Sequence, residues 1–259
     1  MPHKETIVPL RNLREKKYGQ VLCYPRFDLS QIAGRLEELE ALGVKALEFS
    51  GESGVLDMPV LGKGCVGIVV IAHTNQGKAA LKIRRVDADR TEMEHEARML
   101  RRANSVRVGP TLLNVTEDFL LMEFIQGSLL PKWVELACGN DVVGRIRKVL
   151  RCILEQCWRL DEEGIDHGEL STAPKHVLVR SNDKPCLVDF ETASIDRRVA
   201  NVTSICHYLF IGSHFSEIIE AKLGKINKAD LLKVLRIYKR GSTRKRFESV
   251  LDTYGLRKV

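Results

Sequence analysis

A polar loop with the sequence HGELSTAPKHVLV (residues 167–179) holds the residues whose types and spacing best suit chemistry. His167 and the acid Glu169 flank a glycine, and the loop then runs into an apolar, strand-like segment. Loops carried by regular elements are where folds present catalytic side chains. A further acid, Asp189, follows the next strand-like segment in CLVDFETAS. The stretch is therefore either a catalytic loop or an ordinary turn.

A glycine-rich segment, LGKGCVGIVV, places Gly62, Gly64 and Gly67 in GxGxxG spacing and is followed by Val69 in a β-like run. A dinucleotide-binding fold needs this motif between a strand and a helix. Here β-like sequence lies on both sides, so the motif is predicted to form a hairpin. Glycines in a hairpin let backbone N–H groups approach phosphate oxygens, because no Cβ is in the way. A glycine-rich hairpin without a ligand is the alternative.

Lys82 ends the next strand-like segment, AALK, where its ammonium could reach phosphates bound at the glycines. A lysine within an apolar strand needs an acidic partner. The following helix offers Glu92 and Glu96, which share a face because they are four residues apart. Glu96 is followed by Ala97 and is the predicted inward carboxylate, so we expect a Lys82–Glu96 ion pair.

These residues must be positioned by an alternation of short strands and longer helices. Apolar periodicity predicts a helix over 28–43, with Asp28 at its start and Gly43 as its stop. A β-rich block with one helix comes first, and a helical block with a short hairpin follows, which is an α+β arrangement of two lobes with a cleft between them. The other expected helices are 87–104, 141–163, 197–211, 213–223 and 228–254 with a break near Gly241; the expected strands are 57–63, 66–73, 78–84, 111–115, 118–125, 177–180 and 186–188.

The composition, with 29% charged and 44% hydrophobic residues in 259, is that of a soluble globular protein. No apolar run approaches the roughly 18 residues that span a bilayer, and the first residues lack the apolar core of a signal peptide. We therefore expect a cytoplasmic protein with no membrane contact. The seven cysteines are odd in number and form no Cys-x-x-Cys pair, which favours reduced thiols over a zinc site.

The positive charge is concentrated at the C-terminal end. Residues 221–259 contain twelve Lys or Arg and three Asp or Glu, a net of +9, whereas the whole chain carries +7. A basic segment of this kind suits an anionic partner such as RNA or a ribonucleoprotein. A solvated helical face that needs no partner is the alternative.

Taken in order, these motifs resemble the small lobe of a protein kinase: the glycine motif with Val69, then Ala80-Leu81-Lys82, then Glu96, then FLLMEFIQG. The resemblance covers about residues 58–211. It implies a bilobal protein-kinase-like fold that binds ATP and Mg²⁺ in its cleft, with Lys82 and Glu96 holding the phosphates. It also implies that the ATP site includes the following residues: Gly62, Gly64, Gly67, Val69, Ala80, Met122 as gatekeeper, and the backbone of Glu123 and Ile125.

The second half of the resemblance assigns roles in the loop. The segment beginning at His167 stands where kinases carry a His-x-Asp loop, so Glu169 would be the base or would orient a water. Asp189 stands in the place of the Asp in Asp-Phe-Gly and would bind magnesium. Asp166 precedes the histidine, in a position that points elsewhere in this fold. Lys175 is a candidate γ-phosphate contact, with a solvated turn lysine as the alternative.

The loop departs from the kinase pattern at two positions. The family acid is Asp, one methylene shorter than Glu169. Five residues after Glu169, where kinases carry a magnesium-binding Asn, stands Pro174. Aligning the following strand instead inserts two residues and puts His176 in the Asn position, as a second candidate metal ligand. Because neutral imidazole prefers softer metals than magnesium, a hydrogen bond within the loop is the alternative role of His176.

After Asp189 there is no long activation loop and no Ala-Pro-Glu, and the helical lobe is reduced. This trimmed form resembles the atypical small kinases, namely the RIO family and the kinase of the KEOPS complex, and most of all the compact RIO-like serine/threonine kinases of archaea. RIO proteins act in ribosome maturation. The implied parts are an N-terminal extension (1–57), an N-lobe (58–126), a catalytic C-lobe (127–211) and a basic helical segment (212–259).

The expected activity is ATP-dependent phosphotransfer to Ser or Thr of the protein itself or of a partner, or to water. Two alternatives stay open. One is a pseudokinase scaffold that holds a ribonucleoprotein partner. The other is a small-molecule phosphotransferase of the aminoglycoside or sugar-kinase type, which also uses His-Gly-acid loops.

Overall fold

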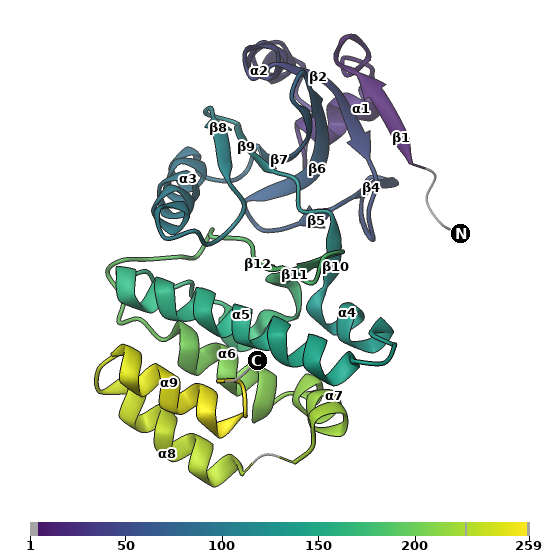
Figure 1. Ribbon diagram of the computed structural model, residues 1–259. Helices are drawn as coiled ribbons and strands as arrows, with labels where there is room; N and C mark the ends of the chain where they lie inside the picture. The colour runs from purple at the N-terminus through teal and green to yellow at the C-terminus, as the bar shows by residue number, and fades with distance from the viewer. Residues whose placement is uncertain (1–4, 226, 258–259) are drawn as a thin grey trace. The chain divides into compact units, whose positions relative to one another are not determined.

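The computed structural model describes residues 5–225 and 227–257 and has an α+β fold (Figure 1). The chain forms two compact units. Unit 1 comprises the residues up to 101 together with 110–124, and unit 2 comprises 102–109 and the residues from 125 onward. Each unit carries one part of the candidate chemistry, so each is described by itself.

Unit 1 is built on an antiparallel sheet with the strand order β1-β2-β6-β7-β9-β8, to which β5 adds by pairing with β6. A separate two-stranded hairpin, β3–β4, precedes β5. The strands are β1 (Thr6–Pro9), β2 (Val44–Phe49), β3 (Ser53–Val55), β4 (Met58–Val60), β5 (Gly62–Lys63), β6 (Gly67–Thr74), β7 (Gly77–Arg84), β8 (Leu112–Val115) and β9 (Phe119–Glu123).

The helices of unit 1 include one that the sequence predicts closely, α2 (Leu29–Ala41). Asp28 caps it by accepting a 2.9 Å hydrogen bond from the backbone N–H of Ser30. Gly43 follows the helix end in the left-handed region at φ +73°, as expected of a C-terminal stop. The remaining helical elements are a short 3-10 turn (Leu10–Asn12), α1 (Lys16–Leu22) and α3 (Arg90–Ser105), whose last turn belongs to unit 2.

The segment before residue 58, which the sequence analysis treats as an extension, contributes strands β1 and β2 to the same sheet as β6 and β7. Neither strand was predicted. A buried ion pair also joins α2 to this sheet. Arg35 of α2 is 1% exposed, and its Nη2 lies 2.9 Å from Oδ1 of Asp118, the residue before β9. Asp118 also binds Arg84, at the end of β7. The extension therefore folds as part of unit 1.

The register of the sheet separates its two faces. Leu81 and Ile83 of β7 point into a core shared with α1 and α2. Their neighbours Ala80 and Lys82 lie on the other face, because successive strand residues alternate. Val69 is paired with Lys82, and Met122 is paired with Ala80. The side chains of Val69 and Met122 therefore lie on the same face of the sheet as Ala80 and Lys82.

Unit 2 is mainly helical and includes a three-stranded sheet in the order β10-β11-β12. Its longest helix, α5 (Val142–Glu163), buries an apolar stripe from Ile146 to Leu160 and ends at Gly164, which has φ +76°. Around it lie the helices drawn in green and yellow in Figure 1. The other elements are β10 (Gly127–Leu129), α4 (Leu130–Leu136), the 3-10 segment η2 (Leu170–Lys175), β11 (Val177–Arg180), β12 (Pro185–Leu187), α6 (Asn201–Phe210), α7 (His214–Leu223), α8 (Lys228–Lys239) and α9 (Arg244–Thr253).

Two differences from the expected elements have identifiable causes, and one expected break is present. The predicted start of α6 at 197 is wrong, since the helix begins at Asn201, where the buried Asp161 of α5 accepts its first N–H groups. Strand β10 was not predicted because only its pairing with β11 makes GSL extended. The expected break near Gly241 is confirmed, since α8 ends at Lys239 and α9 begins at Arg244.

No helix in the described ranges is long and apolar enough to cross a membrane. All seven cysteines are free thiols, as the sequence predicts.

Candidate functional site

In unit 1 the predicted ion pair is present. Nζ of Lys82 on β7 lies 2.6 Å from Oε2 of Glu96 on α3, and the two side chains are 5% and 3% exposed. A buried ammonium and a buried carboxylate each cost several kcal/mol to desolvate alone, so each requires the other. The pair fixes α3 to the sheet face that carries Val69, Ala80 and Met122. Glu96, not Glu92, is therefore the inward acid.

Gly67, the third glycine of the GxGxxG motif, has a direct packing role at this lysine. A Cβ on Gly67 would lie 2.9 Å from Cγ of Lys82 and 2.9 Å from the carbonyl oxygen of Ile83. Only glycine leaves room for the lysine stem to cross β6 at this point. Gly62 has no such role, since its Cβ would meet only Val69, at 3.9 Å.

The motif forms the predicted hairpin between β5 and β6. The N–H of Gly64 donates to the carbonyl of Gly67 at 2.8 Å, which closes the turn and leaves that N–H unavailable to a phosphate. Arg85 holds the turn from outside, because its backbone N–H donates to the carbonyl of Val66 at 2.8 Å. The exposed Cys65 lies within this turn.

The remaining residues predicted to contact adenine do not all fall in one unit. Met122 and Glu123 end β9, and the N–H of Glu123 donates to the carbonyl of Thr111 at 2.8 Å. Ile125 is buried in unit 2. The sheet register thus groups Val69, Ala80 and Met122 with the Lys82 pair.

In unit 2 the HGE loop is shaped by Gly168. This residue has φ +91°, and a Cβ there would lie 2.6 Å from Nη2 of Arg197 and 2.8 Å from Oγ1 of Thr192. Both the dihedral angle and the lack of space require glycine. Gly168 therefore fixes the path of the chain between His167 and Glu169, and Glu169 directly precedes the first residue of η2.

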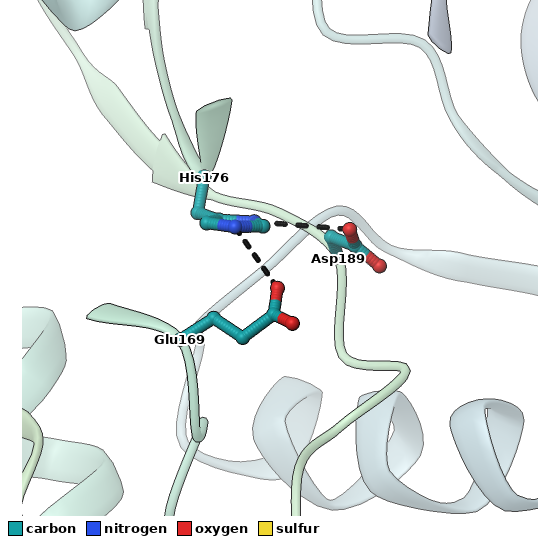
Figure 2. Close-up of side chains that lie close together, drawn as sticks. All are labelled: Glu169, His176 and Asp189. Carbon is teal, nitrogen blue, oxygen red and sulfur yellow. Dashed lines mark ion pairs between the residues drawn. The ribbon is translucent and has the colours of Figure 1, made fainter. Parts of the chain in front are cut away.

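Glu169, His176 and Asp189 form a compact cluster, shown in Figure 2. Nε2 of His176 lies 3.0 Å from Oε2 of Glu169, and Nδ1 of the same ring lies 3.7 Å from Oδ2 of Asp189. One ligand atom from each residue lies within 4.8 Å of the other two. The imidazole is nearly buried, at 10% exposed, whereas the two carboxylates are 38% and 42% exposed.

Asp189 has a backbone conformation that is unusual for a residue other than glycine. Its φ is +69°, in the left-handed region. Such conformations cost about 1–3 kcal/mol and concentrate at functional sites, where the surrounding structure imposes them. The conformation turns the chain directly after Val188, which is fixed by an N–H bond to the carbonyl of His176 at 3.0 Å.

His167 braces the loop from a buried position. Its ring is fully buried, and Nε2 donates a 3.2 Å hydrogen bond to the carbonyl of Val188, next to Asp189. Burial, together with the nearby His176, lowers the pKa of His167 to about 4. His167 is therefore neutral at physiological pH and acts as a brace, not as a proton carrier.

Two polar residues that support this loop were not predicted. Asn201, at the start of α6, accepts a 2.8 Å hydrogen bond from the backbone N–H of His167 and donates to the carbonyl of Ile165 at 2.6 Å. Asp161 of α5 accepts in turn from Nδ2 of Asn201 at 2.8 Å. A charged residue at an apolar position of the α5 stripe is the one signal in the sequence that could have identified Asp161.

The two other charged candidates of the loop lie outside the cluster. Lys175 is exposed and forms no ion pair within the described residues. Asp166 accepts from Nε of Arg197 at 3.0 Å and from the backbone N–H of Ala200 at 3.2 Å, and its backbone pairs with Ser194. These contacts give Asp166 a structural role.

Part of the basic charge at the C-terminal end is compensated within unit 2. Nη1 of Arg244 lies 2.7 Å from Glu155 of α5, and Arg257 pairs with Glu248 at 3.1 Å. By contrast, Arg236, Lys239 and Arg240 are exposed on α8 and at its end, and their side chains pair with no acid in the ranges that the structure describes.

Comparison with known proteins gives one partial likeness. No family model matches the chain. Over 84 residues the chain is 34% identical to the serine/threonine-protein kinase YabT of Bacillus subtilis (strain 168), a match that covers 29% of this chain and 25% of that protein. The chain thus spans about a quarter of the length of the curated relative it matches. The likeness supports a kinase-like relationship and no finer family.

Proposed function

We propose that the protein is an ATP-dependent phosphotransferase of the protein-kinase type. The observation that carries the proposal is the buried Lys82–Glu96 pair, at 2.6 Å, on the sheet face that also presents Val69, Ala80 and Met122. An ammonium fixed in this way can bind phosphate oxygens beside an apolar surface for the adenine. Lys82, Glu96 and the glycine hairpin of unit 1 would bind the nucleotide.

The cluster in unit 2 would supply the carboxylates of the reaction. Asp189 would hold the divalent cation, expected as Mg²⁺, that neutralises charge on the transferred phosphoryl group. Glu169 uses Oε2 for His176, so its other oxygen is the one that would accept the proton of a Ser or Thr hydroxyl or orient a water. The partial identity to a serine/threonine-protein kinase supports Ser or Thr as the acceptor.

A pseudokinase scaffold is the second candidate. The observation in its favour is the Glu169–His176 ion pair of 3.0 Å, because it commits one oxygen of the predicted base to the imidazole. The unpaired cations of α8 would then serve a ribonucleoprotein partner. We also propose, from the resemblance alone, that the kinase is of the RIO-like, archaeal type.

Turnover of γ-labelled ATP by the purified protein, with and without a generic protein acceptor, tests the proposal. We expect Glu169→Gln to lower the rate by about 10²–10⁴-fold, the usual contribution of a general base. Asp196→Asn is a matched control, because Asp196 is exposed on the segment after Asp189 and lies outside the cluster. ATP binding with equal, background rates for wild type and Glu169→Gln would favour the scaffold.

Nucleotide binding is tested separately by thermal-shift titration with ATP. Lys82→Met should remove the ATP-dependent rise in melting temperature. Lys78→Met should keep it, since Lys78 lies on the same strand but pairs with Glu48 at 2.8 Å. A wild-type protein that shows no shift with ATP, with or without a divalent cation, would contradict the proposal. ADP release that depends on an added small metabolite would instead identify a small-molecule phosphotransferase.

A further inference from the structure

Nδ1 of the His176 imidazole has no hydrogen-bond partner among the described residues. The side chain is only 10% exposed, and Nδ1 is buried. Nδ1 faces Oδ2 of Asp189 at 3.7 Å (Figure 2), which is too far for a hydrogen bond. Because buried polar atoms are normally satisfied, an unsatisfied one that faces a carboxylate calls for a ligand between them.

Glu169 determines which nitrogen carries the proton. Nε2 of His176 lies 3.0 Å from Oε2 of Glu169, and a carboxylate so close favours the proton on Nε2 because a carboxylate has none to donate. In the neutral ring Nδ1 then presents its lone pair toward Asp189. A histidine that donates one N–H to a carboxylate and offers its other nitrogen to a metal ion is a recurrent arrangement at metal sites.

The spacing of the two donor atoms suits a single ion. Two ligands that each lie about 2.1 Å from one metal are about 3.0–3.5 Å apart for right-angle to tetrahedral geometry. The observed 3.7 Å between Nδ1 and Oδ2 needs a closure of a few tenths of an ångström. The carboxylate belongs to Asp189, whose backbone is left-handed at φ +69°.

We propose that His176 and Asp189 bind a divalent first-row transition-metal ion in preference to Mg²⁺, with Glu169 as the residue that positions the ring. Mg²⁺ demands oxygen ligands in near-ideal octahedral geometry. Imidazole is a suitable ligand for transition-metal ions, and carboxylate accommodates them. A role of this ion in phosphotransfer rests on the proposed function. The choice of ion rests only on the residues of unit 2.

Mn²⁺ is the probe, because it is paramagnetic and its bound nitrogen ligands are detected directly by pulsed electron paramagnetic resonance. Full-length protein with substoichiometric Mn²⁺ and no nucleotide should show modulation from one ¹⁴N nucleus. The pattern should change to that of ¹⁵N when the protein carries ¹⁵N-labelled histidine. This wild-type measurement does not depend on any variant folding.

Variants then assign the ligand. His176→Asn should abolish the nitrogen modulation and weaken Mn²⁺ binding at least about tenfold, while Mg²⁺ binding holds or improves because the amide offers oxygen. Glu169→Gln should weaken Mn²⁺ by about 10–100-fold, as expected for loss of an outer partner. His214→Asn is the matched control, because His214 also lies 3.0 Å from a carboxylate, Glu217, but that pair is exposed.

Absence of nitrogen modulation in wild type, or a modulation that survives His176→Asn, would overturn the inference. So would a Mg²⁺ affinity equal to that for Mn²⁺ in direct competition. If Mn²⁺ binds through His176 but ATP is neither bound nor turned over, the metal site stands and the proposed phosphotransferase fails. If nucleotide is turned over with Mg²⁺ and no Mn²⁺–nitrogen coupling is detected, the phosphotransferase stands and the metal site fails.

Discussion

The phenol of Tyr238 on α8 donates a 2.8 Å hydrogen bond to Oδ2 of Asp161 on α5. Asp161 also accepts from the backbone N–H and the side-chain amide of Asn201, and Asn201 in turn binds the N–H of His167. Burial raises the pKa of Asp161, against the lowering effect of these donors. One buried network therefore joins the basic C-terminal helices to the loop that presents Glu169.

Removing the Tyr238 hydroxyl tests this network. Tyr238→Phe should lower the free energy of unfolding by about 1.5–3 kcal/mol, the range for a hydrogen bond to a charged group. Tyr208→Phe is the control, because the Tyr208 hydroxyl is also buried in unit 2 but has no hydrogen-bond partner among the described residues. Urea denaturation followed by circular dichroism measures both. Equal losses in the two variants would show that Tyr238 contributes only packing.

The contacts of Asp161 also show which features could not be predicted from the sequence. The periodicity of residues 141–163 predicts α5 because its apolar stripe lies within one element. The role of Asp161 depends on Asn201 and Tyr238, which are 40 and 77 residues away along the chain. No local pattern contains those contacts, so the start of α6 was placed four residues too early. Strands β1 and β2 were missed for the same reason, since their partners are distant strands.

Motif spacing was more informative about chemistry than about architecture. The pairing of Lys82 with Glu96 and the turn at Gly67 follow from short segments with strong constraints: a lysine in an apolar strand and glycines in a hairpin. The contact of His176 with both Glu169 and Asp189 could not be predicted, because it depends on the kink of η2 at Thr172, whose φ is −121° and ψ 46°. The sequence offered a hydrogen bond and a metal ligand as alternative roles for this histidine; the structure places Nε2 3.0 Å from Glu169 and Nδ1 3.7 Å from Asp189.

The third glycine of the GxGxxG motif gives a second prediction. Gly67→Ala should weaken ATP binding and destabilise unit 1 by about 1–3 kcal/mol, the usual cost of overpacking, because the new methyl group displaces the stem of Lys82. Gly62→Ala should have little effect on either quantity, since its methyl group would meet only ordinary van der Waals contact. Thermal-shift titration with ATP measures the two variants side by side. Similar ATP responses would contradict a role of Gly67 in placing Lys82.

The buried ion pair gives a third prediction. Glu96→Gln removes the carboxylate that lies 2.6 Å from the buried Lys82 ammonium and should cost about 3–5 kcal/mol of folding stability. The double variant Lys82→Met/Glu96→Gln should be more stable than Glu96→Gln alone, because it also removes the buried ammonium. Denaturant titration of the two single variants and the double variant measures the coupling. Additive losses would mean that the two side chains do not interact in solution.

Burial of His167 predicts a specific dependence of stability on pH. The pKa of His167 is lowered from 6.5 to about 4 in the folded protein. Below pH 6.5 the unfolded chain therefore takes up a proton that the folded chain does not. The free energy of unfolding consequently falls as the pH falls. The loss is complete near pH 4 and amounts to about 3 kcal/mol, since each pKa unit is worth about 1.4 kcal/mol. Above pH 6.5 this group contributes no pH dependence.

Comparison with His167→Gln isolates this effect from other titrating groups, because glutamine can still donate to the carbonyl of Val188 but carries no titrating proton. The stability advantage of wild type over the variant should shrink by about 3 kcal/mol between pH 7 and pH 4. Urea denaturation at half-unit pH steps gives the two curves. If the variant folds poorly, the histidine ring resonances of wild type provide the same information: His167 should stay neutral down to about pH 5, and a midpoint near 6.5 would contradict a buried, neutral brace.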